Sequence, residues 1–274
     1  MQRRGNLYTL GFAAVICIIC SIIVSTASVA LRERQQENII LDRQINVLTV
    51  AGLIEVGERI GAEEAQRRFD ENIELRIIEL ETGEYADDAV RQPYDPVEAA
   101  RDSELGRRAP ANRAGISYLP RYAIVHHVME DGEIDMIVIQ VWGSGLWGMM
   151  YGYLAFDSDG VTIRGITFYE HEETPGLGGE VDNPRWKAHW EGREAYDDDW
   201  QLAIVMRKAG AGPPEEDPHG FDAISGATFT SRGVEALIRF WLGEHGYGPY
   251  LKRYHNNNDE QEDTTVAMVA PSGI

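Results

Sequence analysis

The N-terminal region contains a long uncharged run, and this run limits the possible folds more than any other feature. No charged residue occurs between Leu7 and Leu31, and most residues in the run are apolar. A helix needs roughly 20 consecutive apolar residues to cross the hydrocarbon core of a bilayer, and this run is longer. The sequence therefore predicts an N-terminal tail and transmembrane anchor over residues 1–31.

A cleaved signal peptide is the competing interpretation of this run. Arg3 and Arg4 precede it, and Ser28 and Ala30 offer the small residues that a cleavage site requires. The apolar part of a signal peptide is usually only about 7–15 residues long. The length of the run therefore favours a retained, single-pass anchor.

The charges beside the run do not decide on which side of the membrane the rest of the chain lies. Arg3 and Arg4 lie before the span, whereas Arg32 and Arg34 lie after it. The positive-inside rule compares these two sets, and they balance. A short tail inside and a large acidic domain outside is the simpler arrangement.

The composition excludes several classes of function. The chain has 45 acidic residues and 25 Lys and Arg residues, a formal net charge of −20. This charge argues against nucleic acid as a partner and against broad binding to an anionic lipid surface. The two cysteines, Cys17 and Cys20, both lie in the apolar run, so the rest of the chain can form no disulfide or Cys-ligated cluster.

The histidines give no indication of a metal site. His126, His127 and His171 show no metal-like spacing with carboxylates, and we expect them at surface or hairpin positions. Glu172 and Glu173 are expected to form a solvated pair. The sequence therefore predicts no bound metal.

Residues 32–115 are expected to form a membrane-proximal helix, a strand and a linker. Apolar residues at helical spacing predict that a helix continues from Arg32 to about Glu58. Alternating apolar and charged residues predict a half-buried strand over Ile73–Ile77. Asp87–Asn112 is charged, contains three prolines and indicates a loop or linker.

Residues 116–254 are expected to form the main domain. Tyr122–Met129 and Ile134–Trp142 flank a Glu-Asp-Gly-Glu turn, and Met150–Phe156 and Val161–Tyr169 flank an Asp-Ser-Asp-Gly turn. Turns of this kind predict two hairpins of antiparallel strands.

The remaining segments favour an α+β fold. We expect a helix over Glu180–Trp190, a further strand over Trp200–Arg207, and a disordered acidic tail over residues 255–274. Strands in a run with segregated helices predict a mostly antiparallel sheet rather than a doubly wound parallel one.

A cluster of hydroxyl side chains precedes one predicted helix. Asp222–Ser231 holds four of them around Gly226 and Ala227, where the backbone can approach a ligand closely. Apolar residues then recur at helical spacing from Val234 to Trp241. The cluster therefore lies at a helix N-terminus, where free N–H groups and the helix dipole favour a phosphate. An ordinary N-cap is the simpler alternative, because Ser and Thr are preferred caps on any helix.

Two glycine-rich segments differ in what they indicate. Gly143–Gly148 matches G-x-G-x-x-G, but the following residues predict a strand, so we exclude a dinucleotide site. Thr174–Glu180 carries three glycines before a predicted helix, and this pattern fits either a tight turn or a loop that holds a ligand.

The order Asp-x-x-Ser-Gly-Ala-Thr over Asp222–Thr228 is more specific than a cap requires. It resembles the flavin-attachment signature of the FMN-binding domain family. In that family the final Thr or Ser carries FMN through a phosphoester bond.

A wider set of segments resembles the C subunits of the bacterial sodium-translocating NADH:quinone oxidoreductases. The G subunit of Rnf-type electron-transport complexes shares the flavin motif and is the nearest alternative. The Thr-Pro-Gly-Leu-Gly-Gly-Glu run, with Val181–Pro184 after it, favours the sodium pump. The segments that carry the resemblance are Gly145–Gly148, Met150–Tyr153, Glu173–Glu180, Ser225–Thr228, Phe240–Gly243 and Gly248–Leu251.

The resemblance implies a single-span flavoprotein that faces the periplasm from the bacterial inner membrane. It implies covalent FMN on Thr228 and electron transfer within a six-subunit pump. The implied partners are the other subunits, the lipid bilayer and a flavin transferase that installs the FMN.

The resemblance also implies roles for residues around Thr228. Asp222 would matter to the flavin transferase, and Trp147 would lie near the isoalloxazine ring. Thr174, Gly176 and Leu177 would line that ring. The phosphate would be surrounded by Ser225, Gly226, Ala227 and Thr230.

A function of another class also fits the sequence. The chain could be a membrane-anchored binding or scaffold module without a cofactor, in which the hydroxyl cluster is only a helix cap. Visible absorbance or fluorescence that survives denaturation would distinguish the two functions.

Overall fold

The computed structural model describes residues 5–55, 57–208 and 210–269. The chain divides into two compact units between Ile45 and Asn46, and the long helix α1 (Asn6–Val50) runs through this division. We describe each unit by itself.

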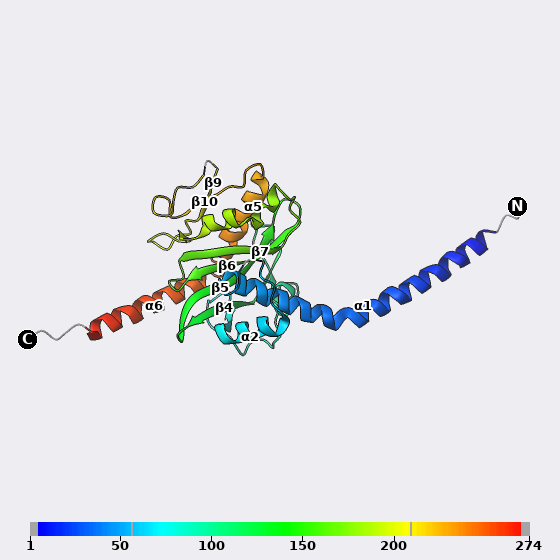
Figure 1. The fold of residues 1–274 in the computed structure, drawn as a ribbon, viewed down its shortest axis with the longest axis horizontal. Coiled ribbons are helices and arrows are strands. Elements are labelled where there is room, and N and C mark those ends of the chain that lie inside the picture. The colour runs from blue at the N-terminus through cyan, green and yellow to red at the C-terminus, as the bar shows by residue number, and fades with distance from the viewer. Residues whose placement is uncertain (1–4, 56, 209, 270–274) are drawn as a thin grey trace, which may run out of the picture. The chain divides into compact units, whose positions relative to one another are not determined.

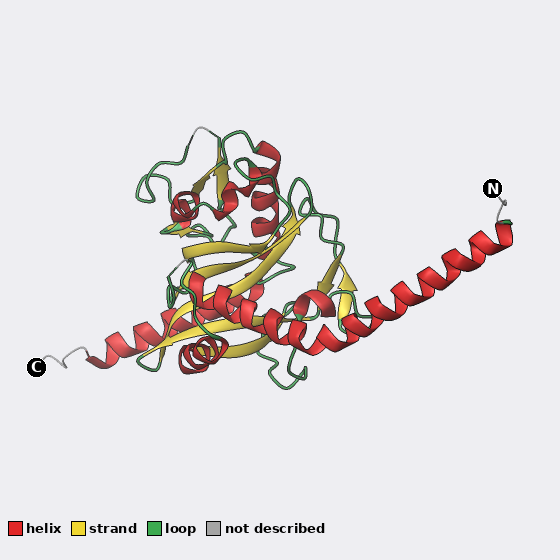
Figure 2. Cartoon of the chain, turned by 45° about the vertical axis from the view of Figure 1, so that its right-hand side comes forward, coloured by secondary structure: helices red, strands yellow, loops and turns green. Residues whose placement is uncertain are grey.

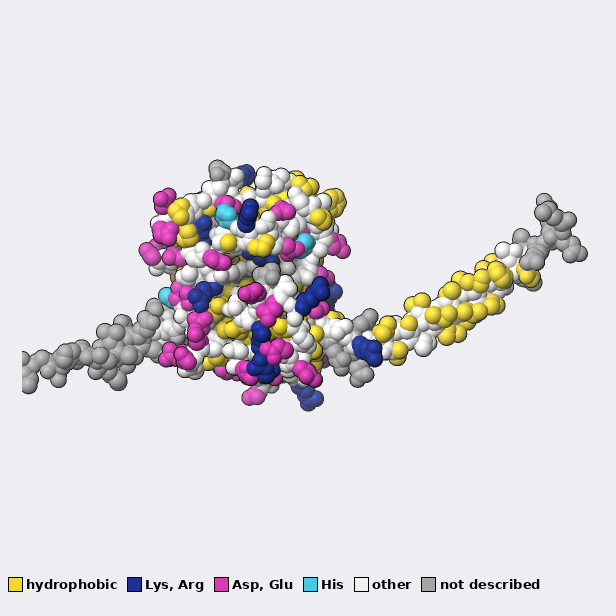
Figure 3. Space-filling view, viewed as in Figure 1, with side chains coloured by type: hydrophobic (Ala, Val, Ile, Leu, Met, Phe, Trp, Pro, Cys, Tyr) yellow, Lys and Arg dark blue, Asp and Glu magenta, His cyan; other side chains and the backbone are white. Residues whose placement is uncertain are grey.

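The first unit consists of the N-terminal part of α1. The stretch Tyr8–Arg32 is long and apolar enough to cross a membrane, and its apolar side chains are exposed. Figure 3 shows these hydrophobic side chains gathered along the helix. The predicted N-terminal apolar helix is therefore present.

The second unit is built on a six-stranded antiparallel sheet (Figure 1). Its strand order is β1-β4-β5-β6-β7-β8, and the two predicted hairpins are β4-β5 and β6-β7. Asp131 and Gly132 form the first turn with φ values of 52° and 88°, which are the values that a two-residue hairpin of type I′ requires. The strands are β1 Ile73–Glu79, β4 Tyr122–Glu130, β5 Glu133–Ser144, β6 Met149–Asp157, β7 Thr162–Glu170 and β8 Arg193–Glu194.

Helices cover both faces of this sheet, as Figure 2 shows. Every residue of β5 from Met136 to Gly143 is buried, which requires cover on both sides. Helix α5 (Thr228–Trp241) contacts β5, and the Trp241 indole donates a hydrogen bond to the Trp142 carbonyl at 2.7 Å. Helix α2 (Ala62–Asn72) contacts β1 and β4. The sheet therefore supports α5 along its buried face.

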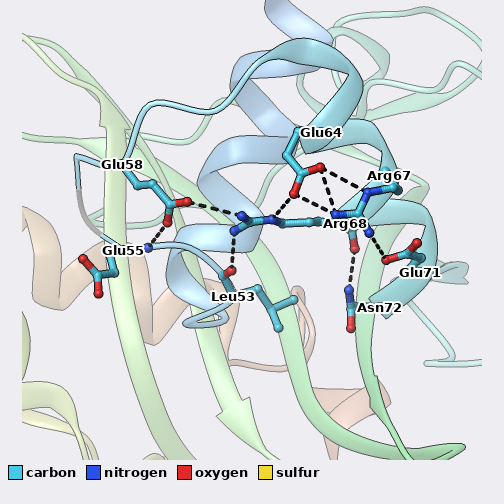
Figure 4. Close-up of polar contacts among 8 residues, drawn as sticks. All are labelled: Leu53, Glu55, Glu58, Glu64, Arg67, Arg68, Glu71 and Asn72. Carbon is cyan, nitrogen blue, oxygen red and sulfur yellow. Dashed lines mark hydrogen bonds and ion pairs between the residues drawn. The ribbon is translucent and has the colours of Figure 1, made fainter.

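Arg68 on α2 makes hydrogen bonds to residues in the segment that joins α1 to α2 (Figure 4). Its guanidinium donates to the Leu53 carbonyl at 3.2 Å and to the carboxylates of Glu64 and Glu58 at 2.7 and 3.3 Å. Exposed ion pairs contribute little, about 0–1 kcal/mol each. The bond to the Leu53 carbonyl links α2 to the residues that follow α1.

Most of Asp87–Asn112 is turn or irregular backbone, as expected for a loop, but the segment packs on the domain, so the linker alternative is wrong. It contains α3 (Pro96–Ala99) and β2 (Gly106–Arg108), and β2 pairs with β3 (Tyr118–Pro120). Tyr94 and Ala99 pack with Ile77 of β1 in a buried cluster. Charge and proline content suggested a linker, but a few apolar side chains are enough to dock the segment on the sheet.

The expected boundary between residues 115 and 116 also differs from the structure. β1 pairs with β4 from Ile73↔Val128 to Glu79↔Tyr122, so one sheet includes residues from both sides of that boundary. The compact unit begins at Asn46. The sequence showed β1 as a strand but not its pairing partner, which lies more than forty residues later in the chain.

Two further elements differ in detail from the predictions. Glu180–Trp190 is not one helix, because a second helix begins at Pro184. The Asn183 side chain caps this second helix by accepting a hydrogen bond from Arg185 N at 3.0 Å. The strand predicted over Trp200–Arg207 is only β9 (Val205–Arg207), parallel to β10 (Gly220–Asp222). The three short helices are η1 Gly178–Asp182, α4 Pro184–Lys187 and η2 Ala188–Trp190.

The sequence predicts a disordered acidic tail over residues 255–274, whereas in the structure helix α6 covers Gly248–Val269. The segment between Tyr254 and Val269 contains no Gly or Pro, the two residues that disfavour helices most. Residues 270–274 lie outside the part of the chain that the structure describes.

His126 and His127 lie on β4 of the first hairpin, one of the two kinds of position expected for them, but they are buried and not at the surface. His126 Nδ1 lies 3.3 Å from the Val138 carbonyl, and His127 Nε2 lies 2.7 Å from the Tyr250 hydroxyl. Burial lowers the pKa of each imidazole to about 4, because the charged form loses its hydration.

This burial predicts acid sensitivity. Between pH 6.5 and pH 4 the unfolded histidines bind protons that the folded ones do not, so the free energy of unfolding decreases as the pH falls. From pH 7 to pH 5, one such histidine accounts for a loss of about 2 kcal/mol. Urea titrations at pH 7 and pH 5 measure this loss in the free energy of unfolding. The loss should be about 2 kcal/mol smaller in His126→Asn than in wild type, because Asn does not titrate. Asn also keeps a donor for the Val138 carbonyl. Equal losses in both proteins would contradict this explanation.

Candidate functional site

The N-terminus of α5 has no side-chain cap. Ala227 occupies the N-cap position and Thr228 is the first helical residue. In the described part of the chain, the backbone N–H groups of Thr228, Phe229 and Thr230 make no hydrogen bond, and the first one used is Ser231 N to the Ala227 carbonyl at 3.0 Å. Free N–H groups at a helix start attract an anion. The simple N-cap alternative therefore does not hold.

The structure separates the four hydroxyls of the cluster into two kinds. Ser231 is buried, where its Oγ accepts from Ile224 N and donates to the Ala227 carbonyl, both at 2.9 Å. Thr230 is buried, and its hydroxyl donates to Glu173 Oε2. Ser225 and Thr228 are exposed and have no hydrogen-bond partner among the described residues. Only these two hydroxyls are open to a ligand, and only Thr228 lies on the helix.

Glu173 joins three segments beneath the site. Its Oε1 accepts from Leu146 N at 2.7 Å and from Trp147 N at 3.1 Å, while its Oε2 accepts from Thr230. A Cβ at residue 178 would collide with both Glu173 and Thr230, so this position requires Gly178. The carboxylate therefore fixes the β5-β6 loop and the loop after β7 against α5.

The prediction that Glu173 is a solvated residue is wrong, since its side chain is only 5% exposed. Its neighbour Glu172 is exposed as expected. A charged side chain is buried only where donors surround it. In the sequence these donors are far from Glu173, and the glycine at 178 was the one local signal of the tight packing.

Four large apolar side chains remain exposed around Thr228. A Cβ at Gly226, whose φ is +77°, would lie 3.5 Å from Leu177 Cδ2, so the loop after β7 lies beside the hydroxyl cluster. Exposed fractions of 47–65% are high for residues of this kind. An exposed apolar set of this kind marks a binding surface. The four residues are Leu146, Trp147, Leu177 and Phe229.

The structure brings most of the predicted site residues together on two loops and one helix start. Ser225, Gly226, Ala227 and Thr228 are contiguous, and Thr174 and Gly176 form the exposed turn that presents Leu177. The Thr230 hydroxyl is hydrogen-bonded to Glu173, so only the backbone N–H of Thr230 is left for a ligand at the helix start.

Asp222 is half-buried, and its hydrogen bonds fix the segment that leads into the hydroxyl cluster. Its carboxylate accepts from Ala211 N and lies 3.0 Å from His189 Nδ1, and its carbonyl accepts from the Trp186 indole at 2.9 Å. It therefore connects β10 to the loop before it and to α4.

The site fits a phosphorylated, planar aromatic ligand. An open hydroxyl and three free N–H groups suit a phosphate, and the exposed apolar side chains suit a flat ring. Among the described residues, no group of three or more His, Cys, Asp or Glu side chains could hold a metal ion.

A family model described as an FMN-binding domain matches residues 145–243. This range begins in the β5-β6 loop and ends just after α5, so it includes both loops and the helix start described above. The fold and the site thus place this part of the chain in the class of FMN-binding domains.

Similar proteins extend the match over most of the chain. The C subunit of the Na(+)-translocating NADH-quinone reductase of Yersinia pestis is 44% identical over 250 residues, covering 89% of this chain and 91% of the relative. The C subunit from Pseudomonas aeruginosa is 42% identical over 253 residues, covering 91% and 96%. The crystal structure of NqrC from Shewanella oneidensis matches with a TM-score of 0.71 at 33% identity, covering 81% of this chain and 99% of that one.

The chain belongs to the family of C subunits of the Na(+)-translocating NADH-quinone reductases. The resemblance inferred from the sequence is therefore confirmed, and so is the α+β fold with a mostly antiparallel sheet. These relatives favour the sodium pump over the Rnf-type alternative.

Proposed function

We propose that FMN is attached to Thr228 through a phosphoester bond and that the chain carries electrons in a sodium-translocating NADH:quinone oxidoreductase. One observation carries this proposal. Thr228 has an exposed hydroxyl at a helix N-terminus whose first three N–H groups have no partner among the described residues. Those groups and the helix dipole would stabilise the negative charge of the phosphoester.

The loops beside Thr228 would hold the flavin ring. Leu177, presented by the turn of Thr174 and Gly176, would pack against one part of the isoalloxazine, with Trp147 near it. When bound, FMN supplies the electron-carrying chemistry, while this chain supplies attachment and orientation. Because these side chains are exposed, the ring would remain accessible to another redox centre.

Asp222 would act on attachment rather than on electron flow. It organises the segment that leads into the hydroxyl cluster through Ala211 and His189, and we propose that a flavin transferase recognises this segment.

The experiment that tests the proposed function is denaturation of the full chain coexpressed with a flavin transferase. Flavin fluorescence that stays with the denatured band supports covalent FMN. A colourless, nonfluorescent band would leave the cofactor-free scaffold as the better account.

We further propose that the chain is anchored in the bacterial inner membrane as one of six subunits, with the domain on the periplasmic side. The stretch Tyr8–Arg32 supports the anchor. Covalent attachment is useful outside the cytoplasm, because noncovalent FMN would dissociate where little free ligand is present.

This orientation predicts that the mature protein keeps its N-terminus and that protease digests the domain in intact spheroplasts. Intact-mass measurement and a spheroplast protease assay check the two parts. A mature chain that begins at Leu31 would contradict the anchor, and protection of the domain would contradict the orientation.

A further inference from the structure

A groove with a volume of about 960 Å³ runs along α5 beside the candidate flavin site. Four cationic side chains and a single acidic one, Glu235, line it. The chain as a whole has 45 acidic and 25 Lys and Arg residues, so it is negatively charged, whereas the groove is lined mainly by positively charged side chains. The cationic residues are Arg113, Lys208, Arg232 and Arg239.

Three of these cations have no partner within the described part of the chain. Arg113, Lys208 and Arg232 are exposed and make no hydrogen bond or ion pair there. Exposed arginines elsewhere are of two kinds, because Arg67, Arg164, Arg207 and Arg253 pair with carboxylates, whereas Arg91, Arg108 and Arg185 form no ion pair in the described chain. The groove differs from both in gathering three unpaired cations in one cavity. The groove therefore keeps charge available for something outside the chain.

The other two charged side chains are used internally. Arg239 donates to the Ile204 carbonyl at 2.6 Å, and Glu235 accepts from Met206 N at 3.0 Å. Glu235 therefore does not neutralise the three free cations by ion pairing. The charge that faces the groove is strongly positive.

Apolar side chains lie between these cations. Leu146 is 48% exposed and Phe229 is 65% exposed, and Met206 and Phe240 also line the groove. Arginine and aromatic side chains together are typical of the core of protein–protein interfaces. A free phosphate would satisfy the cations but would leave this apolar surface in water.

The groove is next to the attachment residue. Arg232 follows Thr228 by four residues on α5, so the two side chains lie on the same face of the helix, one turn apart. Leu146 precedes Trp147 in the β5-β6 loop. A protein segment seated in the groove would therefore lie beside the flavin.

We propose that this groove docks an acidic protein segment that carries at least one bulky apolar side chain, contributed by the neighbouring protein that exchanges electrons with the flavin. This proposal rests on the proposed function for the identity of the partner, but not for the chemistry of the groove. Opposite charges would guide the partner and fix its orientation, while Phe229 and Leu146 would exclude water.

The test compares two triple charge reversals in the complete complex. The groove variant is Arg113→Glu, Lys208→Glu and Arg232→Glu. The control variant is Arg91→Glu, Arg108→Glu and Arg185→Glu, whose arginines are also exposed and whose side chains form no ion pair in the described chain. Thermal melting of each variant tests folding, and in-gel fluorescence tests covalent flavin.

We expect the groove variant to keep its flavin and its melting temperature but to lose at least tenfold in NADH-to-quinone electron transfer. It should also separate from the complex at a lower salt concentration than the control, which should behave as wild type. Wild-type assembly and turnover in the groove variant would overturn the proposal.

Two further outcomes distinguish the alternatives. Saturable binding of pyrophosphate to the wild-type protein, lost in the groove variant while assembly is unchanged, would overturn docking in favour of a small-anion site. A wild-type chain without flavin would contradict the proposed function, whereas salt-sensitive assembly that depends on the groove would still support the docking surface.

Discussion

Thr228→Ala should leave the chain without covalent flavin while the fold persists. The Thr228 side chain is exposed and makes no hydrogen bond to the described part of the chain, so its loss removes the acceptor oxygen and little else. We expect fluorescence of the denatured band to fall to background, and the free energy of unfolding to change by no more than about 0.5 kcal/mol.

Two matched variants make this result specific. Thr228→Ser keeps a hydroxyl at the helix start and should keep some or all of the attachment. Ser225→Ala removes the other exposed hydroxyl of the cluster and should leave covalent attachment of the flavin unchanged. A Thr228→Ala chain that still fluoresces after denaturation would place the flavin elsewhere.

Glu173→Ala is expected to have the largest structural effect on the site. It leaves Leu146 N, Trp147 N and the Thr230 hydroxyl without their common acceptor. Hydrogen bonds to a charged group contribute about 1.5–3 kcal/mol each, so a loss of roughly 3 kcal/mol or more is expected. The loops would no longer be held against α5, and flavin loading should fall several-fold.

Urea unfolding and in-gel fluorescence measure the two effects on the same protein. Glu173→Gln keeps one acceptor oxygen and should be less damaging than Glu173→Ala. Glu172→Ala alters the neighbouring, exposed carboxylate and serves as the control. Equal stability of the Glu173→Ala and Glu172→Ala chains would show that the three hydrogen bonds do not support the site.

The features predicted correctly from the sequence depend on residues close together in the chain. The hairpin at Asp131 and Gly132 could be predicted because Asp-Gly is a preferred pair for a turn in which both residues have positive φ. The buried face of α5, including Val234, Leu237 and Trp241, follows from helical spacing. Because the hydroxyl cluster and the helix are adjacent in sequence, their combination at a helix N-terminus could also be predicted.

The features that the sequence did not reveal depend on distant partners. Glu173 is buried because donors arrive from residues 146, 147 and 230. Burial of His127 likewise depends on Tyr250, which lies on α6. Thr228 and Thr230 carry the same hydroxyl group in different environments, because Thr230 is buried against Glu173 and Thr228 is exposed to solvent. The sequence does not distinguish the two.

Peptide mass mapping of the flavinylated chain tests the central claim most directly. Trypsin cleavage after Lys208 and Arg232 releases one peptide that contains every hydroxyl of the cluster. The account predicts that this peptide carries the mass of one FMN minus one water and that fragmentation places the added mass on Thr228. An FMN on Ser225, Thr230 or Ser231, or an unmodified peptide from a chain coexpressed with a flavin transferase, would contradict it.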